Sequence, residues 1–86
     1  MARYTSKALQ QDLKEINVMI QKATNGRYFL EAQSRNGYTG LDLYRMEGDR
    51  RKCERNIQCG SPRECLEAAE SYKSGVLESH LMAQEG

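Results

Sequence analysis

The chain has 86 residues, of which 38% are hydrophobic and 29% are charged, and 13 Lys and Arg against 12 Asp and Glu leave a net charge of +1. So short a chain buries only roughly 60% of the surface of its unfolded state, which predicts a single domain over residues 1–86, with an ordered core at about 6–78 and a flexible C-terminal tail. The balanced charge excludes a global attraction to nucleic acid or to an anionic membrane. Without a signal-like or membrane-spanning apolar run, we expect a cytoplasmic protein with no membrane contact.

The first predicted element is a helix over residues 6–24. Its apolar residues recur at alternating steps of four and three, the period of one helix face. Asn25-Gly26 supplies the stop signal, because a glycine just past a helix readily takes the left-handed conformation that closes the last turn. The residues of this stripe are Leu9, Leu13, Ile16, Ile20 and Ala23.

Two strands, 27–34 and 38–46, are predicted on either side of Asn36-Gly37. This dipeptide favours a two-residue hairpin turn, since both turn residues need a positive φ. With that turn the register is set, and alternate residues point to opposite faces. The pairs Ala32/Leu41 and Leu30/Leu43 fall on one face, and Glu31/Asp42 and Phe29/Tyr44 fall on the other.

A third strand is expected after the turn around Gly48, and its register depends on the parity of the loop. A two- or four-residue loop would place Ile57 and Cys59 on the face that carries Asp42. A three-residue loop, Gly48 to Arg50, instead directs Cys53, Ile57 and Cys59 to the apolar face, and we adopt it. The open face would then gain Lys52, Glu54 and Asn56.

A second helix is predicted from Pro62 onward. Ser61 stands at the N-cap position, proline occupies the favoured first helical position, and Glu64 completes a capping box. Gly75 interrupts the apolar stripe of this helix at a cost of about 1 kcal/mol relative to alanine. The fold class is therefore α+β, a two-layer α-β-β-β-α domain in which both helices cover one face of a three-stranded antiparallel meander.

The uncovered sheet face, or alternatively the second predicted helix, is the candidate surface for binding another protein. Aromatic residues and methionine are favoured at protein interfaces. A simpler interpretation remains open, in which Phe29 and Tyr44 only stabilise the hairpin, and Glu31 and Asp42 only form salt bridges with Lys52 or a nearby arginine. The candidate partner-binding residues are Phe29, Glu31, Tyr38, Asp42, Tyr44 and Met46.

Catalytic and metal chemistry find little support in the sequence. Cys53, Cys59 and Cys65 lack the Cys-x-x-Cys spacing of a zinc knuckle, and the one histidine, His80, falls in the last turn of the predicted second helix rather than beside them. We interpret the cysteines as small buried hydrophobes and expect no enzyme activity, no cofactor and no metal. The densest basic cluster, a candidate phosphate contact or a charged edge strand, is Arg50, Arg51, Lys52 and Arg55.

Two resemblances follow from these motifs. The element order, with Gly60-Ser61 opening the second helix, resembles double-stranded RNA-binding domains, although Pro62 and Arg63 stand where that family carries consecutive lysines. The run 35–44, followed by Gly60-Ser61, is similar to small uncharacterised proteins of bacteriophages and mobile elements, which implies binding or inhibition of a host factor.

We therefore expect a small non-enzymatic module that binds another protein, with nucleic-acid binding as the alternative. A homodimer stays open, because an edge strand or the uncovered face can pair across a twofold axis.

Overall fold

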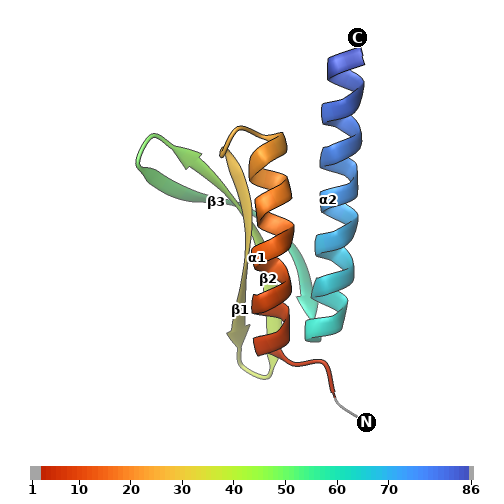
Figure 1. The fold of residues 1–86 in the computed structure, drawn as a ribbon. Helices are drawn as coiled ribbons and strands as arrows, with labels where there is room; N and C mark the ends of the chain where they lie inside the picture. Colours follow the sequence, from red (N-terminus) through yellow and green to blue (C-terminus); the bar gives the residue numbers. More distant parts are fainter. Residues whose placement is uncertain (1–2, 86) are drawn as a thin grey trace.

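The computed structural model describes residues 3–85, without the side chains of residue 35 and of residues 80–85. Its elements are α1 (Ser6–Ala23), β1 (Tyr28–Arg35), β2 (Tyr38–Glu47), β3 (Arg50–Gly60) and α2 (Pro62–Glu85). The strands form an antiparallel sheet in the order β1-β2-β3, with the helices beside it (Figure 1). This confirms the predicted α-β-β-β-α order and the α+β fold class.

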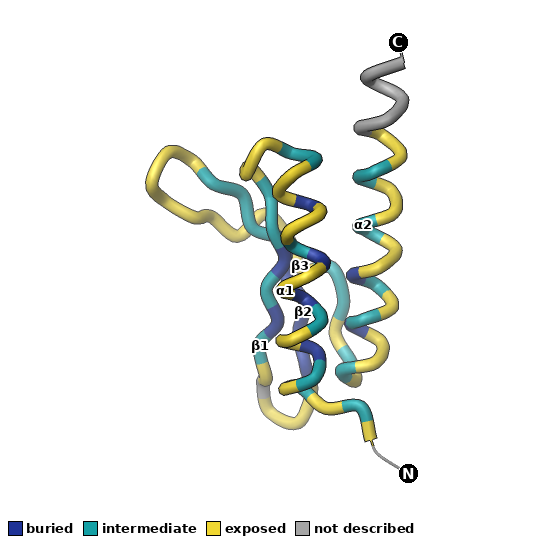
Figure 2. The backbone as a smooth tube through the Cα atoms, viewed as in Figure 1, coloured by how far each residue is buried: buried dark blue, intermediate teal, exposed yellow. Residues whose placement is uncertain are grey.

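The core lies between the helices and one face of the sheet. The buried stripe of α1 packs on Leu30 and Ala32 of β1 and on their β2 neighbours, and α2 adds Cys65 and Ala69 to the same cluster. Figure 2 shows this buried zone running between α1 and the sheet, while the β2–β3 hairpin is largely exposed. The buried residues of α1 and β2 are Leu9, Leu13, Ile16, Ile20, Leu41 and Leu43.

Neither described helix is long and apolar enough to cross a membrane.

The β1–β2 hairpin has the predicted register without a shift. Arg35 pairs with Tyr38 across the turn, and Leu30 pairs with Leu43 on the core face. Asn36 and Gly37 have φ values of 27° and 86°, so the turn occupies the positive-φ region that the dipeptide tolerates. The turn chemistry and the apolar alternation therefore specify the same pairing.

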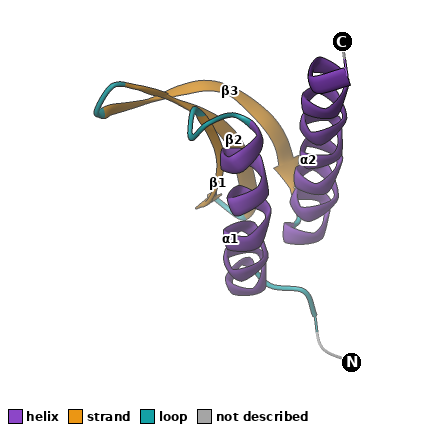
Figure 3. Cartoon of the chain, turned by 45° about the horizontal axis from the view of Figure 1, so that its top comes forward, coloured by secondary structure: helices purple, strands orange, loops and turns teal. Residues whose placement is uncertain are grey.

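The β2–β3 hairpin differs from the prediction. Its turn has two residues, because Glu47 pairs with Arg50, and the register shifts twice, between Leu41 and Asp42 and between Leu43 and Tyr44. The expected three-residue loop is therefore wrong. β-Bulges insert an extra residue into one strand and bend it, so parity changes between the two shifts and is restored after the second. Figure 3 shows the resulting curvature of β3, which runs from the projecting hairpin to the start of α2.

Side-chain amides of α1 occupy the outer edge of β1. Asn17 accepts a hydrogen bond from the Leu30 amide at 2.7 Å and donates one to the Leu30 carbonyl at 2.8 Å. Gln10 donates to the carbonyl of Ala32 at 2.8 Å. An exposed strand edge is a template for pairing with other chains, and here the helix covers it.

The capping box at the start of α2 forms as predicted. The Ser61 amide donates to Glu64 Oε1 at 3.0 Å, and the Glu64 amide donates to Ser61 Oγ at 3.2 Å. α2 then continues past Gly75 to Glu85, further than the expected ordered core. Whether the C-terminal end is flexible stays a prediction, because the side chains from His80 onward lie outside the described residues.

Candidate functional site

The uncovered face of the sheet carries a stacked aromatic pair. Phe29 of β1 lies directly opposite Tyr44 of β2. Their ring centroids are 5.5 Å apart and the ring planes differ by 12°. Both residues are half-buried, and Gln33 donates to the Tyr44 hydroxyl at 3.4 Å. The stack is an apolar platform whose orientation is set by two neighbouring strands.

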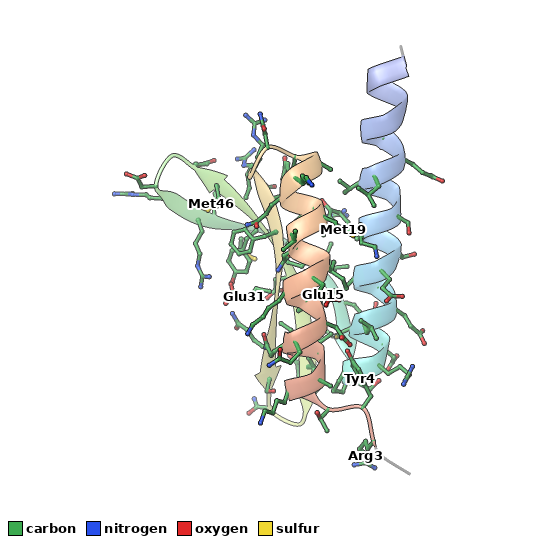
Figure 4. The ribbon with its side chains drawn as sticks, in the orientation of Figure 1. Arg3, Tyr4, Glu15, Met19, Glu31 and Met46 are labelled. Carbon is green, nitrogen blue, oxygen red and sulfur yellow. The ribbon has the colours of Figure 1, made fainter. Side chains whose placement is uncertain are left out.

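Arg51 of β3 joins this pair to an acidic residue. Its guanidinium carbon lies 4.9 Å from the centroid of the Tyr44 ring, and its Nη1 donates to Glu31 Oε2 at 2.5 Å. A guanidinium over an aromatic face is attracted by the ring quadrupole, and the carboxylate fixes its direction. We call Phe29, Glu31, Tyr44 and Arg51 the open-face cluster. In Figure 4, Glu31 lies on the sheet and Met46 lies further out along the β2–β3 hairpin.

The sequence predicts Lys52 on the open face and includes Arg51 among the candidate phosphate contacts. The two-residue turn reverses these positions, since Arg51 pairs with Met46 and Lys52 pairs with Arg45. A signal for this arrangement was present, because Gly48-Asp49 is itself a dipeptide typical of two-residue hairpin loops. Gly48 has a φ of 64°.

Asp42 is buried, with 3% of its surface exposed, and so it is not part of an accessible surface. Asn56 donates to Asp42 Oδ1 at 2.9 Å and to the Leu41 carbonyl at 3.2 Å. These bonds lie at the first register shift of the β2–β3 ladder. A buried carboxylate needs hydrogen-bond donors, and Asn56 supplies one here. Asp42 therefore helps to organise the bulge.

Tyr38, 43% exposed, and Met46, half-buried, do not join the open-face cluster. Tyr38 instead lines a hollow of about 940 Å³ between the N-terminal arm, the β1–β2 turn and the start of α2. Tyr4 lies in the same hollow, donating to Asp12 Oδ2 at 2.5 Å, with the Arg63 guanidinium 5.2 Å from its ring centroid. Figure 4 shows Arg3 and Tyr4 at this end of the molecule.

The basic cluster is divided between the two faces of β3. Arg51 lies on the open face, whereas Arg50, Lys52 and Arg55 pair with Glu47, Arg45 and Leu43 on the helix side. Arg45 also forms ion pairs with Glu47 and Glu54 at 2.6 and 2.8 Å. Only Arg51 is therefore separated from the other three cations, which share one face of β3.

The cysteines occupy two environments. Cys65 is fully buried, and desolvation raises the pKa of its thiol above the ordinary value. Cys53 and Cys59 are exposed, which corrects the expectation that all three are buried. A three-residue loop predicts Cys53 and Cys59 on the core side, whereas in the structure they lie opposite Tyr44 and Gly40 on the other face.

No group of three or more His, Cys, Asp or Glu side chains is arranged to hold a metal ion among the described residues.

Comparisons with known protein families, curated proteins and solved structures find no match to this chain.

Proposed function

We propose that the chain is a small non-enzymatic module that binds another protein through its open sheet face. The observation that carries this proposal is the open-face cluster, in which an arginine from β3 spans a stacked Phe29/Tyr44 pair and a carboxylate from β1. Arginine and tyrosine are enriched among the residues that dominate binding energy at interfaces. The side chain of Arg51 is 53% exposed, so a partner can still desolvate it.

The arrangement also limits the entropy lost on binding. Tyrosine and phenylalanine have few rotatable bonds, and here each ring is already stacked on the other. The guanidinium is held by both the Tyr44 ring and Glu31, so less rotamer freedom remains to be lost. A preorganised surface of this kind suits recognition better than bond-making chemistry. The proposal places the protein in the cytoplasm, with a host protein as the partner, following the resemblance to phage and mobile-element proteins.

The test is an affinity pulldown from native lysate of the source cells, with the wild-type chain and the Tyr44→Ala variant as bait. We expect a partner that is retained by the wild type and lost with Tyr44→Ala. Val18→Ala is the matched control, because Val18 is 62% exposed on α1, outside the open-face cluster. A partner retained equally by both variants would count against this surface.

The experiment also distinguishes recognition from a purely structural role of the aromatic pair. A cross-strand pair is worth roughly 0.2–1 kcal/mol of stability, which does not unfold a stable domain. Circular dichroism of Tyr44→Ala therefore should show a folded chain. Loss of partner binding by this folded variant supports the proposal, and binding of duplex RNA or DNA through β3 in a mobility-shift assay would favour the nucleic-acid alternative.

A further inference from the structure

The two edges of the sheet are not equivalent. At β1, Asn17 bonds both the amide and the carbonyl of Leu30, and Gln10 bonds the carbonyl of Ala32. At β3, residues 50–56 are all exposed, and among the described residues no hydrogen bond from outside the sheet reaches their backbone. The hairpin that carries this segment projects away from both helices (Figure 1). The outer edge of β3 is therefore open to a further strand.

The pairing pattern identifies which backbone groups face outward. Antiparallel residues alternate between pairs that exchange hydrogen bonds and pairs that do not. Leu30 directs its amide and carbonyl away from β2 to Asn17, so its partner Leu43 directs its own groups toward β3. By the same alternation Arg45 and Glu47 bond to β3, which leaves the amides and carbonyls of Arg51 and Cys53 at the outer edge.

The charge of this edge selects among possible occupants. Arg50, Lys52 and Arg55 are exposed, and none of them belongs to an ion pair of the described residues. A second copy of the chain that pairs antiparallel about Arg51 would set Arg50 opposite Lys52, and like charges directly opposite on a sheet are destabilising. An acidic segment would be attracted instead. The edge thus disfavours self-pairing and favours a segment of opposite charge.

The alternation of side chains along a strand then sets the residue pattern of a segment that pairs with the edge of β3. On an added strand, side chains that lie next to Arg50 and Lys52 project on the helix side, where acidic residues complement the cations. The intervening side chains project beside Cys53 and Arg51 on the open face, where apolar residues extend the platform formed by Phe29 and Tyr44. Main-chain bonds provide affinity in this mode of recognition, and the alternating side chains provide specificity.

We infer that the partner of this module binds by adding an extended acidic strand to the outer edge of β3, over residues 50–54. This inference rests on the proposed function, because it specifies how a partner reaches the open-face cluster. The bulge near Glu54 limits the regular part of the edge to this short segment.

The probe is a synthetic peptide that alternates glutamate and valine over about nine residues, the length of an ordinary strand. Titrated into the isotope-labelled chain, it is expected to shift the amide signals of residues 50–54 and to slow hydrogen exchange at Arg51 and Cys53. The matched peptide with lysine in place of glutamate is expected to bind at least about tenfold more weakly, as is an acidic peptide N-methylated at alternate residues. Lys52→Glu should weaken acidic-peptide binding, whereas Lys14→Glu, a charge reversal on exposed α1, should not.

Several outcomes would overturn the inference. These are equal binding of the acidic and basic peptides, no binding of the acidic peptide, tighter binding of duplex RNA to residues 50–55, or self-association of the free chain through β3. The proposed function fails separately. If Tyr44→Ala still loses its partner in the pulldown while the acidic peptide leaves β3 unchanged, the open face binds protein but not by strand addition. If Tyr44→Ala keeps its partner, the open-face cluster is not the contact.

Discussion

The two hairpins of the sheet differ in what determines their register. In β1–β2, Leu30 and Ala32 are buried against the helices, and the pairing runs without a shift from Tyr28 to Arg35. In β2–β3, no residue of β3 is buried, and the ladder shifts register twice. Register is strongly specified where one face is buried and weakly specified where both faces are polar. β1 and β2 therefore contribute buried residues to the core, whereas β3 contributes none.

The largest loss of stability should come from a substitution in the buried core of the β1–β2 hairpin. Leu30→Ala removes a side chain that is 2% exposed and should lower the free energy of unfolding by about 2–5 kcal/mol. Cys53→Ala, on exposed β3, should change it by less than about 0.5 kcal/mol. Urea unfolding of both variants measures the difference. Similar losses would mean that the two hairpins contribute equally to stability.

The covered edge of β1 should be the next most sensitive feature. Asn17→Ala leaves the amide and carbonyl of Leu30 without their side-chain partners, and we expect a loss of about 1–3 kcal/mol. Lys14→Ala, also on α1 but exposed, is the control. Asn17→Ala should also self-associate more readily than the control, because it uncovers the edge of β1. Light scattering measures this association. A cost no larger than that of the control would contradict the capping role of Asn17.

The capping box fixes where β3 ends and α2 begins, and it should show a pH dependence. Ser61→Ala should cost about 1 kcal/mol. Hydrogen bonds from Ser61 lower the pKa of Glu64 in the folded chain. A lowered folded-state pKa means that the carboxylate stabilises the fold above the ordinary glutamate pKa and that this contribution is lost as the pH falls through the lowered value.

The stability difference between wild type and Glu64→Gln should therefore shrink on acidification. Thermal unfolding over a series of acidic to neutral buffers measures this difference. A difference that does not change with pH would show that the charge of Glu64 has no part in the cap.

The smallest effect on stability is expected at the open-face cluster. Arg51→Ala removes an exposed ion pair with Glu31 and should lower the free energy of unfolding by about 0.2–1 kcal/mol. Its effect on partner binding should be far larger if the guanidinium is part of the proposed contact surface. The comparison of urea unfolding with pulldown yield tests this separation. A large loss of stability would make the cluster a structural feature of the sheet.

Most of the fold could be predicted from local signals that agree with one another. The apolar stripe of α1, the turn at Asn36-Gly37 and the capping box at Ser61 each rest on a residue pattern with a single favoured conformation, and each forms. The stacked pair Phe29/Tyr44 follows directly from the register of that turn. These features involve neighbouring residues or a fully specified turn.

The register of β3 could not be predicted in the same way. A three-residue loop places both Ile57 and Cys59 on the core side, but the register shifts twice along β3, and only Ile57 packs against the core. Cys59 is exposed, and its thiol donates to Asn56 Oδ1 at 3.2 Å. Because no residue of β3 is buried, its apolar pattern does not specify the register of the strand. The wrong loop length is also the reason why Lys52, rather than Arg51, is predicted on the open face.

Amide hydrogen exchange of the free chain tests the contrast between the two edges most directly. The Leu30 amide, bonded to Asn17, should exchange slowly, as should the ladder amides of β2. The amides of Arg51 and Cys53 should exchange rapidly, because they point away from β2 at the outer edge of β3. Slow exchange of Arg51 and Cys53 in the monomer, or rapid exchange of Leu30, would contradict an edge that is closed at β1 and open at β3.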